Sequence, residues 1–169
     1  PSVANAIRLL ILTGSRRNEV LSATWDQFDL EKGIWTKPAH TTKQKKMEHL
    51  PLSSQVIYLL KNMKKKAITN LLFPGKVEGA SLQDIKKAWN TIRNKAGLPE
   101  VRLHDLRHTH ASHLVSSGLS LSIVGKLLGH TQPSTTQRYA HLADTPLREA
   151  AELFGLKMAK LAGKEELNG

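Results

Sequence analysis

The fold is decided by residues 104–141, whose sequence is HDLRHTHASHLVSSGLSLSIVGKLLGHTQPSTTQRYAH. Two glycines, Gly118 and Gly129, divide this stretch. Glycine favours the end of a helix because it adopts a left-handed backbone conformation without strain. The stretch therefore predicts three short helices, at about residues 105–117, 120–128 and 134–142.

The remainder of the chain predicts further helices around one small β element. Two short extended segments, residues 35–37 and 49–52, flank the polar, lysine-rich residues 41–48, which favours two strands joined by a hairpin. Apolar residues at helical spacing predict helices at about residues 3–12, 17–25, 53–66, 82–96 and 146–162. We therefore expect a mostly α fold with a small antiparallel β-sheet or hairpin.

Composition and charge narrow the class of protein. The chain has 169 residues, 40% of them hydrophobic, and a formal net charge of +11. This excess favours a polyanionic partner, with nucleic acid ahead of an anionic membrane surface. There are no cysteines, which excludes a disulfide scaffold, an iron–sulfur cluster and a cysteine nucleophile. The longest apolar run, residues 56–60, is far shorter than the roughly 20 residues of a membrane span, so no membrane-spanning segment is expected. A membrane is not among the expected partners.

Three segments carry polar residues in a fixed order and spacing. They are TGSRRNE at residues 13–19, Thr42-Lys43 at the expected hairpin tip, and the stretch 104–141. Within the last, His104 and Arg107 are three residues apart, Arg107 and His130 are 23 apart, and His130 and Tyr139 are nine apart. Together these segments resemble the catalytic domain of the tyrosine recombinases, the phage integrase family, over about residues 9–142.

The residue types in this set suit metal-independent chemistry on a phosphodiester. Planar guanidinium groups match the non-bridging oxygens of a phosphate and neutralise the charge that develops during attack. A tyrosine phenol is a nucleophile that leaves a covalent phosphoester and remains a tolerable leaving group in the reverse step. A flexible lysine is suited to protonating the departing 5′-oxygen.

The resemblance implies a role for each residue of the set. It makes Arg16 and Arg107 the phosphate clamp, His130 an additional phosphate donor and Tyr139 the nucleophile. It makes His104 the proton-transfer partner of the tyrosine and Lys43 the general acid, with a 3′-phosphotyrosine as the intermediate. No cofactor is implied.

Several of these residues have a second interpretation. Lys43 shares its loop with Lys45 and Lys46, so a purely electrostatic loop remains an alternative. His104 and His108 have the i, i+4 spacing of a zinc pair, but no glutamate of the metalloprotease type lies between them, and Arg107 would repel a dication. We therefore expect no metal site. The other tyrosine, Tyr58, is expected to pack in the core.

Supporting and DNA-contacting residues complete the prediction. Glu19 is expected to brace a neighbouring arginine or helix end, and Asp105 to give structural support. A side chain that contacts a backbone phosphate must carry positive charge, whereas its exact placement matters less. The candidate phosphate contacts are Arg17, Lys45, Lys46, Lys86, Lys87, Arg102 and Arg138.

The expected organisation is a catalytic domain at residues 1–145 and a helical tail at residues 146–169 that contacts another protomer. The chain begins at Pro1 without an initiator Met, and we expect it to lack the N-terminal DNA-binding domain that the resemblance implies for the full protein. The implied partners are double-stranded DNA, further protomers in a homotetramer, and accessory DNA-bending or excision factors. The expected location is the bacterial cytoplasm, in association with the nucleoid.

The leading function is site-specific integration or excision of phage or mobile-element DNA. A chromosome-dimer-resolving recombinase and a type IB topoisomerase-like enzyme remain alternatives, since both use the same chemistry. A non-catalytic DNA-binding module, with the helix at residues 120–129 in a groove, would not need the ordered Arg–Lys–His–Arg–His–Tyr set.

Overall fold

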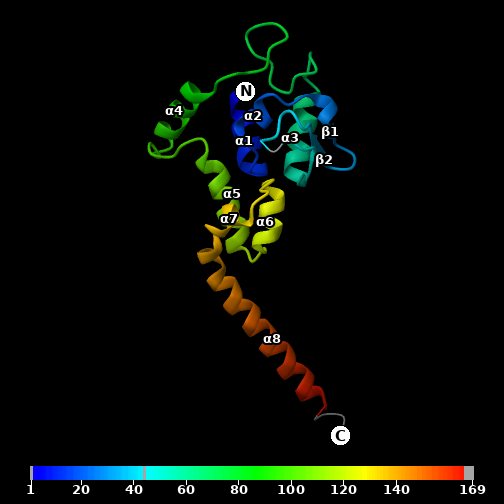
Figure 1. The fold of residues 1–169 in the computed structure, drawn as a ribbon, viewed down its shortest axis with the longest axis vertical. Helices are drawn as coiled ribbons and strands as arrows, with labels where there is room; N and C mark the ends of the chain where they lie inside the picture. The colour runs from blue at the N-terminus through cyan, green and yellow to red at the C-terminus, as the bar shows by residue number, and fades with distance from the viewer. Residues whose placement is uncertain (1, 44, 166–169) are drawn as a thin grey trace. The chain divides into compact units, whose positions relative to one another are not determined.

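The computed structural model describes residues 2–43 and 45–165 (Figure 1). Within this range the chain forms two compact units, residues 2–110 with 127–129, and residues 111–126 with 130–165. The fold is mostly α with one small antiparallel sheet, which confirms the expected fold class. No helix in the described ranges is both long and apolar enough to cross a membrane.

The first unit contains four helices, a 3₁₀ turn, the sheet and the start of a fifth helix. These elements are α1 (Ser2–Thr13), α2 (Arg17–Leu21), η1 (Trp25–Gln27), β1 (Phe28–Asp29), β2 (Ile34–Lys37), β3 (Glu48–Pro51), α3 (Ser54–Lys64), α4 (Lys86–Lys95) and α5 (Asp105–Ser116). Their buried side chains form one core, in which Leu9, Trp35 and Phe73 are fully buried. Phe28 and Trp35 stack in this core with ring centroids 5.0 Å apart.

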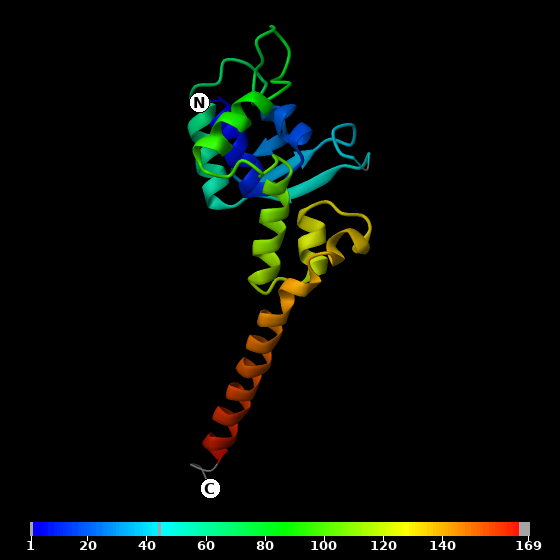
Figure 2. The ribbon, with the colours of Figure 1, turned by 90° about the vertical axis from the view of Figure 1, so that its left-hand side faces the viewer.

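The sheet has the strand order β1-β2-β3, and both strand pairs are antiparallel. β2 and β3 pair with Trp35 opposite Leu50 and Lys37 opposite Glu48, so the expected hairpin is confirmed. Figure 2 shows the connection between β2 and β3 reaching outward from the body of the first unit. The two-residue strand β1 was not predicted, because two residues are too few to show an alternating pattern.

Two predicted helices are shorter than expected. The helix predicted at residues 17–25 ends at Leu21, because the following backbone pairs with a distant loop: Trp25 N donates to the Asn70 carbonyl and Leu72 N to the Ala23 carbonyl. The helix predicted at residues 82–96 begins four residues later than expected. Ser81 forms a β-bridge with Pro74, and α4 begins only at Lys86.

The helix α3 follows the prediction, with Ser53 as its cap: the Ser53 hydroxyl accepts a hydrogen bond from Val56 N. Val56 and Leu60 are buried and lie four residues apart on one face. Tyr58 lies on the opposite face and is 71% exposed. The expectation that Tyr58 packs in the core was therefore wrong.

The second unit contains the end of α5 and four further elements. They are α6 (Leu121–Leu127, of which Leu127 belongs to the first unit), α7 (Pro133–Gln137), η2 (Ala140–Ala143) and α8 (Asp144–Glu165). The helix predicted at residues 134–142 is split, and Tyr139 lies between α7 and η2. The long helix α8 leaves Leu147, Leu153, Phe154 and Leu156 exposed.

Candidate active site

The first predicted arginine lies at the turn between α1 and α2. Gly14 makes this turn with a φ of 61°, and a Cβ there would lie only 2.6 Å from Cδ2 of His110. Arg16 follows two residues later, and its Nη1 donates to Glu19 Oε1 at 2.7 Å. The backbone N of Arg16 donates to the other Glu19 oxygen at 3.1 Å. Glu19 therefore fixes both the main chain and the guanidinium of Arg16, the bracing role that the sequence suggested.

The second predicted arginine is buried and held by main-chain carbonyls. Arg107, on α5, donates from Nη1 to the Gly14 carbonyl at 2.6 Å and from Nη2 to the Leu128 carbonyl at 2.5 Å. Arg16 Nη2 donates to the adjacent Gly129 carbonyl at 3.4 Å. Both guanidinium groups thus bind one turn, residues 128–129, and the fold brings together two arginines that are 91 positions apart in the sequence.

A buried lysine that the sequence analysis did not select joins this cluster. Lys37 Nζ, at the end of β2, donates to Glu19 Oε2 at 2.7 Å and to the Ser15 hydroxyl at 3.0 Å. It also lies 4.6 Å from the centre of the Trp35 ring. Burial raises the pKa of Glu19, but the charge of Lys37 and hydrogen bonds from Lys37 and Arg16 outweigh it, so the pKa lies below its usual value. The alternation of side chains along β2 could have indicated that Lys37 is buried, since Lys37 lies on the same face of the strand as the buried Trp35.

A second carboxylate, Glu48, lies beside the same turn. Gly129 has a φ of 62°, and a Cβ on it would lie 2.5 Å from Glu48 Oε2. Burial raises the pKa of the Glu48 carboxyl, and the charge of Lys37, its cross-strand neighbour, opposes this. Among the described residues, Glu48 Oε1 has no hydrogen-bond partner. The first unit therefore gathers three cationic and two carboxylate side chains around residues 128–129.

Lys43 lies apart from this cluster's buried groups, at the exposed tip of the β2–β3 connection. Thr42 shapes the tip: its buried hydroxyl donates to the Lys46 carbonyl at 2.7 Å and accepts from Lys46 N at 3.2 Å. Lys45 and Lys46 are exposed beside it, and Lys45 has a φ of 52°. The role of general acid for Lys43 stays a prediction.

The remaining residues predicted in the first unit lie at the start of α5. The Asp105 carboxylate accepts from Arg102 N at 2.8 Å and from Arg102 Nη2 at 2.8 Å. These hydrogen bonds lower the pKa of Asp105 to about 2. The His104 ring meets the His108 ring edge to face at 4.9 Å. Burial and the charges of His108 and Arg107 lower the pKa of His104, which favours the neutral imidazole at neutral pH.

The second unit holds the other two residues of the predicted catalytic set. His130 Nδ1 forms a hydrogen bond with the Thr136 hydroxyl at 2.8 Å, and Tyr139 N donates to the Thr136 carbonyl at 3.0 Å. Thr136 is 2% exposed and Tyr139 6% exposed. Thr136 therefore organises both residues. The sequence analysis missed it, because its only signal is its place three residues before Tyr139.

The predicted DNA-contacting residues are mainly exposed. Arg17 is half-buried, and the exposed ones are Lys45, Lys46, Lys86, Lys87, Arg102 and Arg138. Over the described part of the chain, no three His, Asp or Glu side chains gather as a possible metal site.

The comparisons with known proteins identify the family of this chain. The model of the phage integrase family matches residues 2–145, so the chain belongs to this family. The integrase of Salmonella phage P22 is 27% identical over 98% of this chain and 46% of its own length. The tyrosine recombinase XerD of Neisseria meningitidis serogroup B (strain MC58) is 30% identical over 84% of this chain and 51% of its own length.

Solved structures agree with the family in their fold. The XerH site-specific recombinase, bound to its difH substrate in a pre-cleavage complex, superposes with a TM-score of 0.70 and 29% identity over 90% of this chain and 46% of that one. The catalytic domain of bacteriophage HP1 integrase superposes with a TM-score of 0.67 and 28% identity over 90% of this chain and 82% of that one. The chain spans about half the length of the curated relatives it matches.

Proposed function

We propose that this chain is the catalytic part of a site-specific DNA recombinase that cuts and rejoins DNA through a 3′-phosphotyrosine. The arrangement of Arg16 and Arg107 on the turn at residues 128–129 carries the proposal. Two guanidinium groups fixed by carbonyls and a carboxylate are preorganised, so they lose little freedom when a phosphate binds. Such a clamp stabilises the charge that builds on the non-bridging oxygens during attack.

In the proposed reaction, the Tyr139 oxygen attacks phosphorus and gives its proton to neutral His104. The bond from phosphorus to the 5′-oxygen breaks, and Lys43 supplies the proton that the departing 5′-hydroxyl needs. His130 donates a further hydrogen bond to the phosphate, with its ring oriented by Thr136. The covalent phosphotyrosine conserves the bond energy, so a 5′-hydroxyl of another strand reseals the DNA by the reverse steps.

The biological role within this chemistry is proposed as integration or excision of phage or mobile-element DNA. Resemblance to phage integrases supports it, and resemblance to XerD supports a chromosome-dimer-resolving recombinase as the second candidate. A topoisomerase-like activity remains a third. Strand exchange would take place in a homotetramer on DNA, with α8 of the tail contacting a neighbouring protomer, with accessory bending or excision factors, and in association with the nucleoid.

The test is a nicked duplex in which the fragment downstream of the cut diffuses away and traps the covalent intermediate. Denaturing electrophoresis should show an adduct with the unmodified chain, also in EDTA, because arginines supply the positive charge. Tyr139→Phe should abolish the adduct but retain DNA binding, since only one oxygen is removed. Tyr58→Phe is the matched control, and adduct formation by Tyr139→Phe would refute the assignment.

A further inference from the structure

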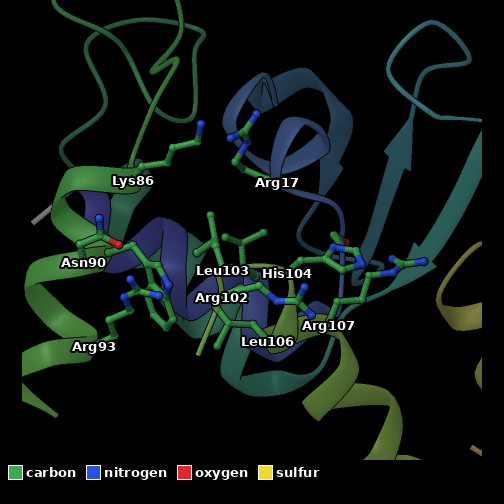
Figure 3. Close-up of a pocket in the computed structure, with 12 residues that line it drawn as sticks. Arg17, Lys86, Asn90, Arg93, Arg102, Leu103, His104, Leu106 and Arg107 are labelled. Atoms are coloured by element: carbon green, nitrogen blue, oxygen red, sulfur yellow. The ribbon is translucent and has the colours of Figure 1, made fainter. Parts of the chain in front are cut away.

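Each of the two units has a cavity that borders predicted catalytic residues. The cavity in the first unit measures about 390 Å³ and has His104 and Arg107 at one end (Figure 3), so it belongs to the site already described. The cavity in the second unit measures about 270 Å³ and is lined by residues of α6, of α7 and of the segment between them, which carries His130. His130 is half-buried, so part of its ring is accessible to a ligand.

The ring of His130 is held by one buried hydroxyl. His130 Nδ1 and Thr136 Oγ1 are 2.8 Å apart and form a hydrogen bond, and Thr136 is 2% exposed. Among the described residues, this is the one hydrogen bond of the Thr136 hydroxyl. A neutral imidazole has one nitrogen that donates and one that accepts. The direction of this hydrogen bond therefore decides what the other ring nitrogen, Nε2, can do.

The proton of the Thr136 hydroxyl needs an acceptor, because the residue is buried. A threonine in a helix can donate to the carbonyl four residues earlier. Thr13, Thr91 and Thr109 do so in this structure, at distances between 2.7 and 3.1 Å. Thr136 lies on α7 and bonds His130 Nδ1 instead. A hydroxyl that donates to Nδ1 leaves the proton of the neutral ring on Nε2.

The backbone around His130 holds the two groups in place. His130 N donates to the Gly125 carbonyl at 2.8 Å, and Tyr139 N donates to the Thr136 carbonyl at 3.0 Å. Gly125 also leaves room for the hydroxyl, because a Cβ on it would lie 2.9 Å from Thr136 Oγ1. These contacts fix the ring, the hydroxyl and the backbone of Tyr139 in one arrangement within the second unit.

We infer that Thr136 is a positioning residue of the proposed reaction: it donates a hydrogen bond to His130 Nδ1 and thereby keeps a proton on Nε2 for donation to the phosphate. The inference rests on the proposed function, in which His130 is a phosphate donor. The hydrogen bond at one ring nitrogen sets the protonation of the other. The opposite tautomer would present a lone pair of Nε2 to an anion. With Thr136 as its donor, a neutral His130 serves the phosphate without gaining a second proton.

The tautomer is measured on the whole chain without DNA, by NMR of histidine labelled with ¹⁵N. A ring nitrogen that carries a proton resonates far from one that does not, and the His130 signals are identified by their loss in His130→Ala. At about pH 8, where histidine is neutral, the proton should lie on Nε2. Thr136→Val should lower the protonated fraction of Nε2, and Thr136→Ser should retain it. A proton on Nδ1 in the unmodified chain would overturn the inference.

The pH dependence of cleavage gives a readout that a loss of packing would not change. At about pH 8, Thr136→Val should cleave the nicked duplex about fivefold or more slowly than the unmodified chain, the worth of one hydrogen bond. An imidazolium carries a proton on both nitrogens, so the ratio of the two rates should approach one as the pH falls through about 6.5. A ratio that does not change with pH would overturn the inference.

This ratio isolates the ring of His130. The proposed effect of pH on His104 is common to both proteins and cancels. Lys126 of α6 is the other charged side chain that lines the cavity beside His130, and α7 carries no charged side chain. Neither helix therefore adds a group that titrates near neutral pH.

Matched variants separate the hydrogen bond from the packing of α7. Thr136→Ser keeps the hydroxyl and should cleave like the unmodified chain. Thr135→Val makes the same exchange on the preceding, half-buried residue and should do the same; a pH-dependent loss equal to that of Thr136→Val would overturn the inference. If Thr136→Val fails to fold, Gly125→Ala replaces it, because the added Cβ turns the hydroxyl away and should give the same ratio.

A double variant tests whether Thr136 acts through His130. In a His130→Ala background, Thr136→Val should cause no further loss of cleavage, whereas an independent loss would overturn the inference. Adduct formation by an unmodified chain with its proton on Nδ1 removes this inference and leaves the proposed function intact. The expected tautomer in a chain that forms no adduct leaves the hydrogen bond from Thr136 standing and removes the proposed function.

Discussion

At the scale of single residues, the most informative contrast is between the two kinds of lysine near the clamp. Lys37 is buried and paired with Glu19, whereas Lys43 is exposed at the tip of the β2–β3 connection. A general acid must reach the leaving oxygen and release its proton, and an ion-paired lysine is poorly placed for both. The exposed position therefore supports Lys43 in the proposed role, and Lys37 serves the stability of the site.

Sulfur substitution tests the role of Lys43. Lys43→Ala should cleave ordinary DNA slowly, because the 5′-oxygen then leaves without a proton. Loss of a full general-acid contribution would lower the cleavage rate by about 10²–10⁴-fold. Replacement of that bridging oxygen by sulfur should rescue the variant, since a thiolate leaves readily. The measurement is single-turnover cleavage of both substrates. Rescue of Lys45→Ala or Lys46→Ala in its place would move the general acid to that residue.

The proposed acid–base role of His104 gives a prediction for pH. Burial, His108 and Arg107 lower the pKa of His104 below 6.5, and Asp105 opposes this shift. In the proposed mechanism the neutral ring accepts the tyrosine proton, so cleavage should stay high at neutral pH and decline only as pH falls through a value below 6.5. His104→Gln should lose this acidic limb. A limb with its midpoint above 6.5 would contradict the assignment.

At the scale of elements, the Lys37–Glu19 ion pair ties β2 to α2. Its side chains are 4% and 1% exposed, so removal of one partner leaves a buried charge. Lys37→Met should lower the free energy of unfolding by about 3–5 kcal/mol, nearer the lower figure because Arg16 still pairs with Glu19. Urea unfolding measures the change, with the exposed Lys64→Met as the control. Equal stability of the two variants would exclude a structural role for the pair.

The pH dependence of this contribution follows from the direction of the Glu19 shift. The pKa of Glu19 is lowered from 4.5 on folding, so its stabilisation is complete above that pH and is lost as pH falls through the lower, folded value. In Lys37→Met the shift is reduced. The difference in stability between the two proteins should therefore shrink in acid.

The elements that the sequence predicted well are those with local signals. Ser53 caps α3 through a hydrogen bond within four residues, and the hairpin strands carry their own polar connection. The predicted start of α4 was wrong because an interaction with a segment outside the helix competes with helix formation. Leu82 N donates to the Phe73 carbonyl, which holds the chain extended. Spacing within residues 104–141 selected His104, Arg107, His130 and Tyr139. Spacing could not reveal the joint anchoring of Arg16 and Arg107 on residues 128–129, since that depends on tertiary packing.

The helix α8 supplies the second prediction at this scale. Leu147, Leu153, Phe154, Leu156 and Met158 are exposed on it, and an apolar surface of this kind favours association. Deletion of residues 146–169 should reduce cooperative assembly on DNA and leave cleavage at a single site detectable. Gel-shift titration with one-site and two-site duplexes measures both effects. Assembly that is unchanged by the deletion would refute a role for α8 between protomers.

At the scale of the whole molecule, the net charge of +11 gives a prediction for how the chain binds DNA. The exposed cations Lys45, Lys46, Lys86, Lys87 and Arg138 come from several elements. We expect them to neutralise backbone phosphates, which carry no sequence information. Each neutralised phosphate releases counterions, so affinity should fall about 10³-fold or more between about 50 and 200 mM salt if six or more phosphates are bound. The proposed phosphate clamp would add two arginines to this total but no sequence preference. Binding of this chain should therefore be weak, steeply dependent on salt and nearly equal for unrelated duplexes.

Fluorescence anisotropy with two duplexes of unrelated sequence over a salt series measures all three properties. Lys64→Met serves as the control for charge alone. Tight binding that discriminates between the duplexes and ignores salt would show that base contacts, not phosphates, dominate.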